Sequence, residues 1–174
     1  MDNKPVEAAK AILGEREPQE VGLARAIARE GHAGQVDKLG VDYFHHPEAV
    51  AKPFEEKGEW ERAAAAWLHD TVEDSGMTVE DLIALGITPR VAEIVDLLTR
   101  KEDVPDDEYY EKIAADEDAL EVKTSDMRHN TDAERMKSLD EPTRVRLLNK
   151  YIHAAEKMGQ NDFASELRSR LTTE

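Results

Sequence analysis

Apolar residues along this chain recur three and four positions apart, which is the spacing of one helix face, and we find no run that alternates as a strand would. The first clear stripe joins Val21, Ala24 and Ala28, in a helix expected from residue 18 to about 31–34. Its start is placed at a proline, which a first turn tolerates. A separate short helix is expected before it, over residues 6–13.

Glycines, prolines and capping residues divide the remainder of the chain into further helices. A loop is expected over residues 34–47, and His46 should lie just before the next helix, because Pro47 disfavours helical geometry in the residue before it. Thr78 is the expected N-cap of a later helix, with Asp81 as a variant of the capping box. The expected helices cover residues 47–57, 59–74, 78–86, 88–100, 119–129, 141–158 and 162–171, with a surface helix inside the acidic segment 102–118.

The pattern as a whole predicts an all-α protein. In the long helix 141–158, four apolar side chains are expected to point inward: Val145, Leu148, Ile152 and Ala155. No internal repeat or linker interrupts the sequence. We therefore expect a single domain over residues 1–174, folded as a compact multi-helix bundle around a central pocket.

Composition narrows the chemistry of that pocket. The 174 residues include no cysteine, which excludes disulfides and Cys-ligated zinc. There is no 18-residue apolar run and no signal-like N-terminus, so we expect no membrane span and a cytoplasmic location. The net charge of −16 offers no basic face for duplex nucleic acid. An anionic substrate would have to be attracted locally, by a metal ion and a few basic side chains.

The stretch WLHDTVEDSG, residues 67–76, places four ionisable groups within six positions: His69, Asp70, Glu73 and Asp74. Its Ala-rich N-terminal flank is expected to form a buried helix, and ionisable groups carried into a core are costly unless they are paired or bind a metal. Adjacent residues on a regular helix diverge by about 100°. His69 and Asp70 can therefore hold one ion only near a helix end, which Ser75–Gly76 would supply.

Two further clusters strengthen the case for a metal site. One is His45-His46-Pro47, and the other is the SDMRHN stretch that contains Asp126. A buried divalent ion would find two imidazoles and two carboxylates in four residues: His46, His69, Asp70 and Asp126. Nitrogen and oxygen ligands of this kind suit Mn, Fe, Co, Mg or Zn. The competing interpretation is a solvated acidic helix end with one capping histidine.

Taken together, the three clusters resemble the HD-domain phosphohydrolase superfamily. Within it, the chain is similar to the RelA/SpoT-type guanosine polyphosphate pyrophosphohydrolases, especially the small stand-alone hydrolases without a synthetase domain. The matching segments are HAGQVDKLGVDYFHHPEAVA (32–51), AAWLHDTVEDSGMTVEDL (65–82) and VKTSDMRHN (122–130). The resemblance extends over about residues 22–158 and implies an HD-domain bundle.

The resemblance also implies roles for particular residues. One divalent ion, manganese in most of the family, would be held by the four candidate ligands. Glu73 and Asp74 match the acidic pair that handles the attacking water, and would be the catalytic residues. Lys38 matches a lysine near the phosphates or base of the substrate, and Asn130 matches a residue lining the nucleotide pocket. An acid within hydrogen-bond reach of a water can orient or deprotonate it.

Three positions depart from the family pattern. The arginine that precedes the matching lysine is Asp37 in this chain, and the Arg-Thr pair after the asparagine is Asp132 and Ala133. The three matching segments, with the acidic pair intact, support the first hypothesis, which is hydrolysis of guanosine 3′,5′-bis(diphosphate) to GDP and pyrophosphate. The departures leave open a phosphohydrolase of another nucleotide or phosphomonoester, and a further alternative is a non-catalytic metal-dependent nucleotide sensor. The expected partner is a small nucleotide, with no membrane or duplex nucleic acid, and a homo-oligomer is left open.

Overall fold

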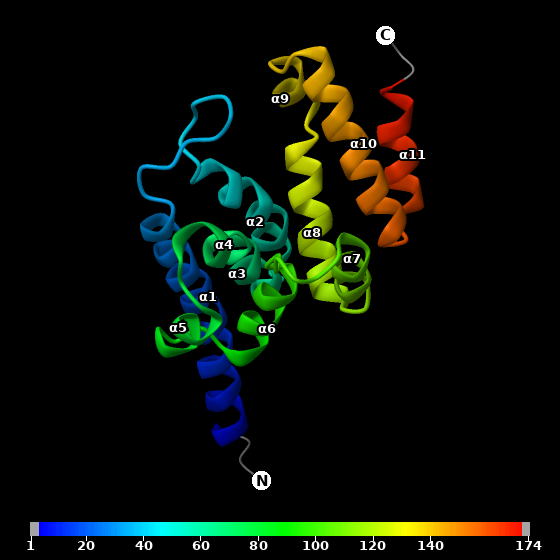
Figure 1. Cartoon of the computed structure of the whole chain (residues 1–174). Helices are drawn as coiled ribbons and strands as arrows, with labels where there is room; N and C mark the ends of the chain where they lie inside the picture. The colour runs from blue at the N-terminus through cyan, green and yellow to red at the C-terminus, as the bar shows by residue number, and fades with distance from the viewer. Residues whose placement is uncertain (1–3, 172–174) are drawn as a thin grey trace.

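Helices make up nearly all of the regular structure in the computed structural model, which describes residues 4–171 and their side chains from residue 18 onward (Figure 1). They are α1 Lys4–Gly31, α2 His45–Lys57, α3 Trp60–Leu68, α4 Thr71–Ser75, α5 Val79–Ala84, α6 Pro89–Leu98, α7 Asp106–Ala114, α8 Glu117–Asn130, α9 Ala133–Lys137, α10 Glu141–Lys157 and α11 Asn161–Ser169. Between residues 4 and 171 the β-structure is limited to one isolated bridge, Val36 with Asp42. The all-α prediction is confirmed.

Helix α3 is the centre of the packing. Its residues 63–68, Ala-Ala-Ala-Ala-Trp-Leu, are all buried. Alanine has almost no side chain, so other helices can approach this one closely. Helix α3 packs against α1, α2, α6 and α8. Helices α10 and α11 pair on the far side of α8 (Figure 1). The core therefore surrounds the short helix that leads into His69 and Asp70.

The continuous helix predicted over residues 59–74 is wrong in one respect that matters for the site. Helix α3 ends at Leu68 and α4 begins at Thr71, with His69 and Asp70 at the break. The predicted end at Gly76 is present, with a left-handed φ of 74°. A break at His69 and Asp70 releases their side chains from the angular separation of a regular helix, so that both can face one point.

Helix boundaries differ from the predictions at two further places. Residues 6–13 and the helix from residue 18 belong to one helix, α1, with Pro18 inside it. Of the intervening residues, Gly14 is a poor helix former, but Glu15, Arg16 and Glu17 are good ones and favour continuation. The side chains of residues 4–17 lie outside the described part. Helix α2 starts at His45, which places His46 inside its first turn, where the missing N–H of Pro47 costs no helical bond.

Two predictions about individual residues have opposite outcomes. Thr78 caps α5 with Asp81 in a full capping box, as predicted. Val145, predicted to point inward, is 38% exposed. The buried face of α10 includes Leu147 and Ala154, and Val145 lies outside the buried set, at the edge of that face. Helix α9 was not predicted. No helix within residues 4–171 is long and apolar enough to cross a membrane.

Candidate metal centre

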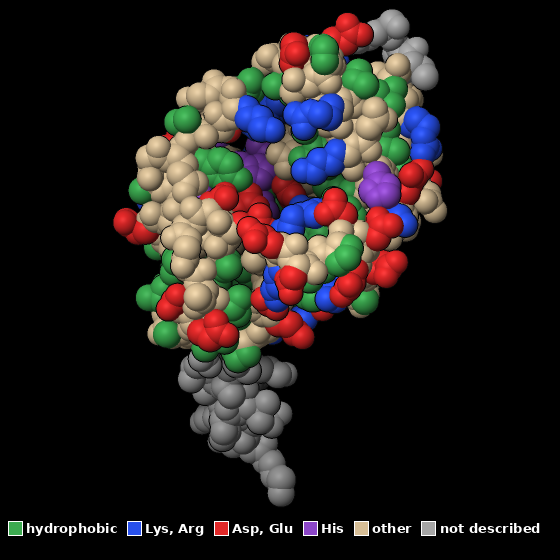
Figure 2. All heavy atoms as spheres, in the orientation of Figure 1, with side chains coloured by type: hydrophobic (Ala, Val, Ile, Leu, Met, Phe, Trp, Pro, Cys, Tyr) green, Lys and Arg blue, Asp and Glu red, His purple; other side chains and the backbone are tan. Residues whose placement is uncertain are grey.

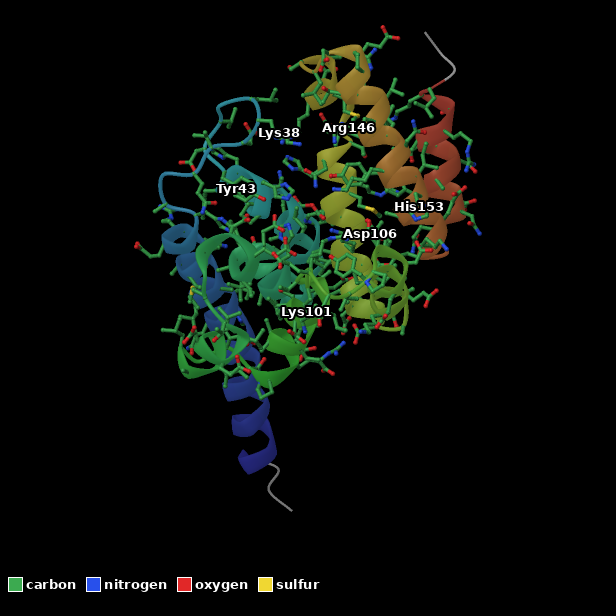
Figure 3. The ribbon with its side chains drawn as sticks, viewed as in Figure 1. Lys38, Tyr43, Lys101, Asp106, Arg146 and His153 are labelled. Carbon is green, nitrogen blue, oxygen red and sulfur yellow. The ribbon has the colours of Figure 1, made fainter. Side chains whose placement is uncertain are left out.

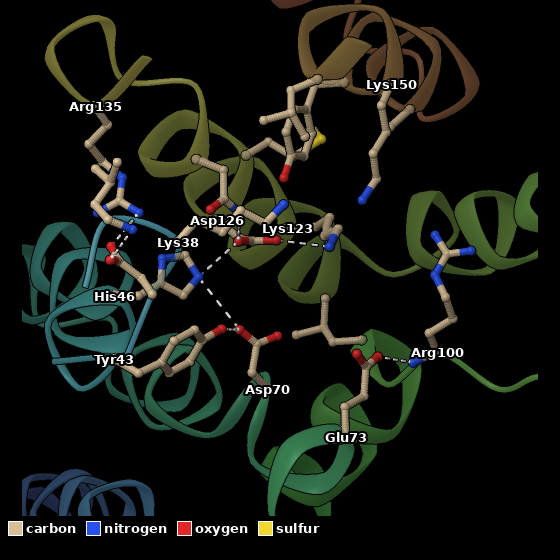
Figure 4. Close-up of a pocket in the computed structure, with 18 of the residues that line it drawn as sticks. Lys38, Tyr43, His46, Asp70, Glu73, Arg100, Lys123, Asp126, Arg135 and Lys150 are labelled. Atoms are coloured by element: carbon tan, nitrogen blue, oxygen red, sulfur yellow. Dashed lines mark hydrogen bonds and ion pairs between the residues drawn. The ribbon is translucent and has the colours of Figure 1, made fainter. Parts of the chain in front are cut away.

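Three buried side chains from distant parts of the sequence converge on one point. Ligand atoms of His46, His69 and Asp126 all lie within 4.8 Å of one another. The Nε2 atoms of the two histidines are 3.1 Å apart, and Asp126 Oδ1 is 3.2 Å from His46 Nε2. Asp70 Oδ2 completes the group, 3.0 Å from His69 Nε2 and 3.5 Å from His46 Nε2. Figure 4 shows His46 between the two carboxylates.

These four side chains come from three separate parts of the fold. His46 lies in the first turn of α2, His69 and Asp70 lie at the break between α3 and α4, and Asp126 lies on α8. Helix α2 packs on α3 and on α8, which brings the three segments together. Because these helices form the core, the cluster is held by the same packing that stabilises the fold.

Hydrogen bonds fix the orientation of both imidazole rings. His69 Nδ1 lies 2.7 Å from the carbonyl oxygen of Ala66 and donates to it, so Nε2 is the atom that faces the cluster and that would offer its lone pair to a cation. His46 Nδ1 lies 2.7 Å from His129 Nδ1. Burial, followed by the charges of His46 and Arg135, lowers the pKa of His129 to about 4, so that ring is a neutral acceptor. His46 therefore donates from Nδ1 and also presents Nε2 as a ligand atom.

The two carboxylates are ionised and oriented. Asp126 accepts hydrogen bonds from Lys123 Nζ at 2.8 Å and from Asn130 Nδ2 at 2.6 Å. Burial would raise the pKa of Asp126, but Lys123 and the histidines hold it well below its ordinary value. Asp70 accepts a hydrogen bond from the Tyr43 hydroxyl, and its pKa is likewise lowered, by His69, against the effect of burial.

The donor set fits a divalent cation. Two imidazole nitrogens and two carboxylate oxygens are characteristic ligands for Mn, Fe, Co or Zn. Although burial opposes it, Asp70 and Asp126 raise the pKa of His69 well above its ordinary value, which shows that the cluster favours positive charge. A cation would satisfy that preference at the same Nε2 atom. The geometry thus supports metal binding by His46, His69 and Asp126, with Asp70 beside them.

The cluster lies at the bottom of a cavity of about 380 Å³. Figure 2 shows the hollow, with histidine at its base and basic side chains around it. Three of the four candidate ligands form part of its wall: His46, Asp70 and Asp126. Basic side chains also line it: Lys38, Arg100, Lys123, Arg135 and Lys150. In a chain with a net charge of −16, this concentration of basic groups favours an anionic ligand.

The structure separates the two acids predicted to handle water. Glu73 lines the cavity and accepts a hydrogen bond from the backbone N–H of Arg100. Burial and the nearby charges of Asp70 and Asp74 raise the pKa of Glu73, although the Arg100 amide opposes this. Asp74 is not among the described residues that line the cavity, and its carbonyl oxygen accepts a hydrogen bond from Gln35. The arrangement favours Glu73 as the acid nearer to a substrate.

The predicted substrate contacts both reach the cavity wall. Lys38 lines it from the loop before α2, and Asn130 lines it while donating to Asp126. Two other basic residues near the motifs form ion pairs and are not among the described residues of the cavity wall: Lys101 pairs with Asp96, and Arg128 with Glu166. In Figure 3, Lys101 lies below Lys38.

Two residues at the site were missed from the sequence. Tyr43, which orients Asp70, lies three residues before His46 in the G-x-x-Y-x-x-H-P pattern, so a signal was present. Arg135 lies on the unpredicted helix α9 and pairs with Asp37, nearly a hundred positions earlier, so no local pattern marks it.

Comparisons with known proteins agree with this geometry. The HD domain family profile matches residues 24–167. A guanosine-3′,5′-bis(diphosphate) 3′-pyrophosphohydrolase of Vibrio cholerae is 38% identical over 89 residues, which are 51% of this chain and 12% of that protein. The bifunctional (p)ppGpp synthase/hydrolase SpoT of Escherichia coli K12 is 36% identical over 88 residues, 50% of this chain and 12% of that one. This chain therefore spans only about an eighth of the length of these relatives.

A solved structure shares the fold. It belongs to a metazoan ortholog of SpoT that hydrolyzes ppGpp, and it superposes with a TM-score of 0.64 at 22% sequence identity, covering 82% of this chain and 84% of that one. At this identity the likeness concerns the fold alone. Together with the profile match over most of the sequence, the fold and the histidine–aspartate cluster show that this chain belongs to the HD domain family.

Proposed function

We propose that this protein is a metal-dependent phosphohydrolase that removes pyrophosphate from the 3′ position of guanosine 3′,5′-bis(diphosphate), leaving GDP. The observation that carries the proposal is the group of His46, His69 and Asp126 at the base of a cavity lined by basic side chains, with Glu73 on its wall. The names of the relatives supply the substrate, since several act on this nucleotide.

The metal would be held by His46, His69, Asp70 and Asp126, and we propose manganese as the native ion. Bound there, a divalent ion would lower the pKa of a water toward neutrality and polarise a phosphoryl oxygen. The surrounding residues prepare the ligands for it: Tyr43 fixes Asp70, Asn130 and Lys123 fix Asp126, and His129 fixes His46.

Glu73 is proposed to orient the attacking water and to accept its proton. A raised pKa brings a carboxylate closer to the range in which it is an effective base. Water adds to the phosphorus bonded to the 3′ oxygen, and the P–O3′ bond breaks. The oxygen of the water stays on the released pyrophosphate, and a proton ends on the 3′ oxygen, which becomes the 3′ hydroxyl of GDP. Asp74 follows Glu73 on α4, and its negative charge is proposed to help keep the pKa of Glu73 raised.

Basic side chains are proposed to bind the phosphates. Lys123 and Arg100 lie on the wall near the acids, where they can neutralise charge on the 3′-diphosphate as water attacks it. Lys38 lies on the wall contributed by the loop before α2. Stabilisation of the charge that develops on the phosphoryl group under attack is one of the larger contributions that an active site makes to a rate.

The test is pyrophosphate release from guanosine 3′,5′-bis(diphosphate) by purified protein loaded with Mn²⁺, beside a Glu73→Gln variant. Release by the wild type with loss in the variant is expected. The second candidate, hydrolysis of a different nucleotide, is favoured by Asp37, Asp132 and Ala133, which replace family residues. It gains if a folded, metal-loaded protein leaves this substrate intact and hydrolyses another nucleotide in a panel. Tight nucleotide binding without any product would instead indicate a sensor.

A further inference from the structure

Two of the positions that depart from the family pattern, Asp37 and Asp132, contact the same residue, Arg135. Asp37 forms an ion pair with Arg135, with Oδ2 and Nη2 3.1 Å apart. Asp132 is the N-cap of α9 and accepts hydrogen bonds from the backbone N–H groups of Glu134 and Arg135 at 3.0 and 3.1 Å. Aspartates that stand where the family has arginines thus fix one arginine at both its backbone and its guanidinium.

Asp37 is a rigid anchor for that contact. Its Oδ1 accepts hydrogen bonds from the backbone N–H groups of Leu39 and Val41, at 2.8 and 3.0 Å, which closes the tight turn of the loop before α2. Its side chain is only 10% exposed. Burial would raise the pKa of Asp37, but these amides and Arg135 lower it below its ordinary value, so the group is anionic. The remaining oxygen is therefore available to orient Arg135.

Arg135 lies at the cavity wall, and its side chain is 29% exposed. Figure 4 shows Arg135 and Arg100 on opposite sides of the cluster formed by His46, Asp70 and Asp126. A guanidinium carries five N–H donors in one plane, so a single contact to Asp37 fixes its direction and leaves donors for a ligand.

Apolar side chains line the same cavity as Arg135. Val36 and Leu39, on either side of Asp37, line the cavity while remaining 62% and 38% exposed. Leu139, just beyond α9, lines it as well. Exposed apolar side chains beside one planar set of donors form a site that a flat, polar-edged ring can cover. The acids and the metal ligands come from other elements, α2, α4 and α8.

We propose that Arg135 contacts the base of the substrate and determines specificity, and that Asp37 and Asp132 are its positioning residues. This inference rests on the proposed function only in taking a nucleotide as the ligand. Guanine presents two acceptors, O6 and N7, on the edge that a guanidinium reads bidentately, whereas adenine presents one acceptor and one donor there. Arg135 therefore favours guanine over adenine. A purely structural ion pair that closes the loop onto α9 would give no such preference.

The test measures the binding of GDP and ADP, by calorimetry with Mn²⁺ present, to the wild type, to four single variants and to one double variant. Arg135→Gln should weaken GDP binding roughly 10- to 100-fold and ADP binding by less than threefold. Arg135→Lys keeps the charge but not the planar fork, so it should not restore the preference. Arg25→Gln is the matched control, because Arg25 also forms an ion pair, with Glu55, and is not among the described residues of the cavity wall.

The fourth variant, Asp37→Asn, tests positioning. It should weaken GDP binding about three- to tenfold on its own, and by no more than twofold when Arg135 is already Gln, because positioning has no effect without the group positioned. Additive losses would overturn the positioning role. Thermal unfolding of every variant shows whether a loss reflects unfolding, and Arg135→Lys is the variant that disturbs packing least.

The remaining outcomes separate this inference from the proposed function. Wild-type protein that binds GDP but releases no pyrophosphate would refute the proposed reaction. The binding of GDP by Arg135→Gln would then still show whether Arg135 contacts the base. Normal GDP binding by Arg135→Gln in an active enzyme would overturn the inference and leave the reaction standing. Equal losses for GDP and ADP would overturn the assignment to the base. Failure of the wild type to bind any nucleotide would overturn both.

Discussion

The base of the cavity, formed by His46, His69 and Asp126, differs physically from its rim, formed by Asp37 and Arg135. The three side chains at the base are 5%, 3% and 4% exposed. His46 and Asp126 lie on helices of the core, and His69 lies at the break between α3 and α4. At the rim, Asp37 lies on a loop and Arg135 on a helix of five residues. The groups at the base converge on one point, where they could hold a cation, whereas the two charges at the rim neutralise each other.

This difference indicates a division of labour. Ligands that must be held within a few tenths of an ångström are attached to the part of the fold that moves least. Side chains that distinguish one substrate from another are attached to loops and short helices, which can change without disturbing the core. The departures from the family pattern at residues 37, 132 and 133 lie in the loop before α2 and at the start of α9, and the candidate ligands at the base match the pattern.

The strongest test of this division between base and rim is Asp126→Asn, which removes one negative charge from the base. We expect loss of bound Mn²⁺ and a fall in pyrophosphate release of about 1000-fold, since metal catalysis contributes several kcal/mol. Lys123 would lose its buried anion, which costs about 3 kcal/mol of folding stability. Metal content by mass spectrometry, thermal unfolding and turnover measure the three effects.

The control for this variant is His45→Ala, at an exposed histidine next to His46 that pairs with Glu48. It should retain metal and turnover within about twofold, since surface substitutions change little. Full metal occupancy in Asp126→Asn would contradict the assignment of the base.

Glu73→Gln separates turnover from metal binding. The amide keeps the shape of the side chain but cannot accept a proton, so kcat should fall about 100- to 10,000-fold while metal content stays normal. Asp74→Asn is the matched variant, since Asp74 lies next in the chain but is not among the described cavity-wall residues. We expect a smaller loss in Asp74→Asn. Equal losses in the two variants would show that the acids act as a pair, and loss of metal in Glu73→Gln would make it a ligand.

Removal of the metal should destabilise the base and leave the rim unaffected. An ion at about 100 times its dissociation constant stabilises the folded state by about 2.7 kcal/mol. For a chain of this size that corresponds to a Tm roughly 5–10 °C higher with Mn²⁺ than with chelator. The same shift is expected in Arg135→Gln, because Arg135 belongs to the rim. A rim variant that lost the shift would show that the two regions are coupled.

The base of the cavity could be predicted from the sequence because its chemistry is local. The helices around it follow from apolar spacing, and its ligands fall in three short stretches with distinctive residues. What the pattern did not predict was the break at His69 and Asp70. His69, Asp70 and Thr71 are weak helix formers, but none of them is a glycine or proline that would mark a break, so the place where the helix stops depends on packing in three dimensions.

The rim could not be predicted in the same way. The contact between Asp37 and Arg135 joins residues far apart in the sequence, and α9 is too short to show a helical repeat. Asp37, Asp132 and Ala133 were identified as departures, but their meaning depends on which side chains the fold brings together. A substitution that appears, from the sequence alone, to remove a residue of the family pattern can therefore form part of a new contact in the folded protein.

The smallest effect we predict is the pH dependence of that contact. The pKa of Asp37 is lowered in the folded protein, so its stabilisation is present above the unfolded value of about 3.9 and is lost as the pH falls through the folded value. Wild type should exceed Asp37→Asn in stability by about 1 kcal/mol at pH 7, and the difference should shrink below about pH 4. Unfolding of both proteins by denaturant from pH 3 to 7 measures it. Because every other titrating group is common to both, a constant difference across this range would mean that Asp37 acts through its shape and hydrogen bonds, not through its charge on Arg135.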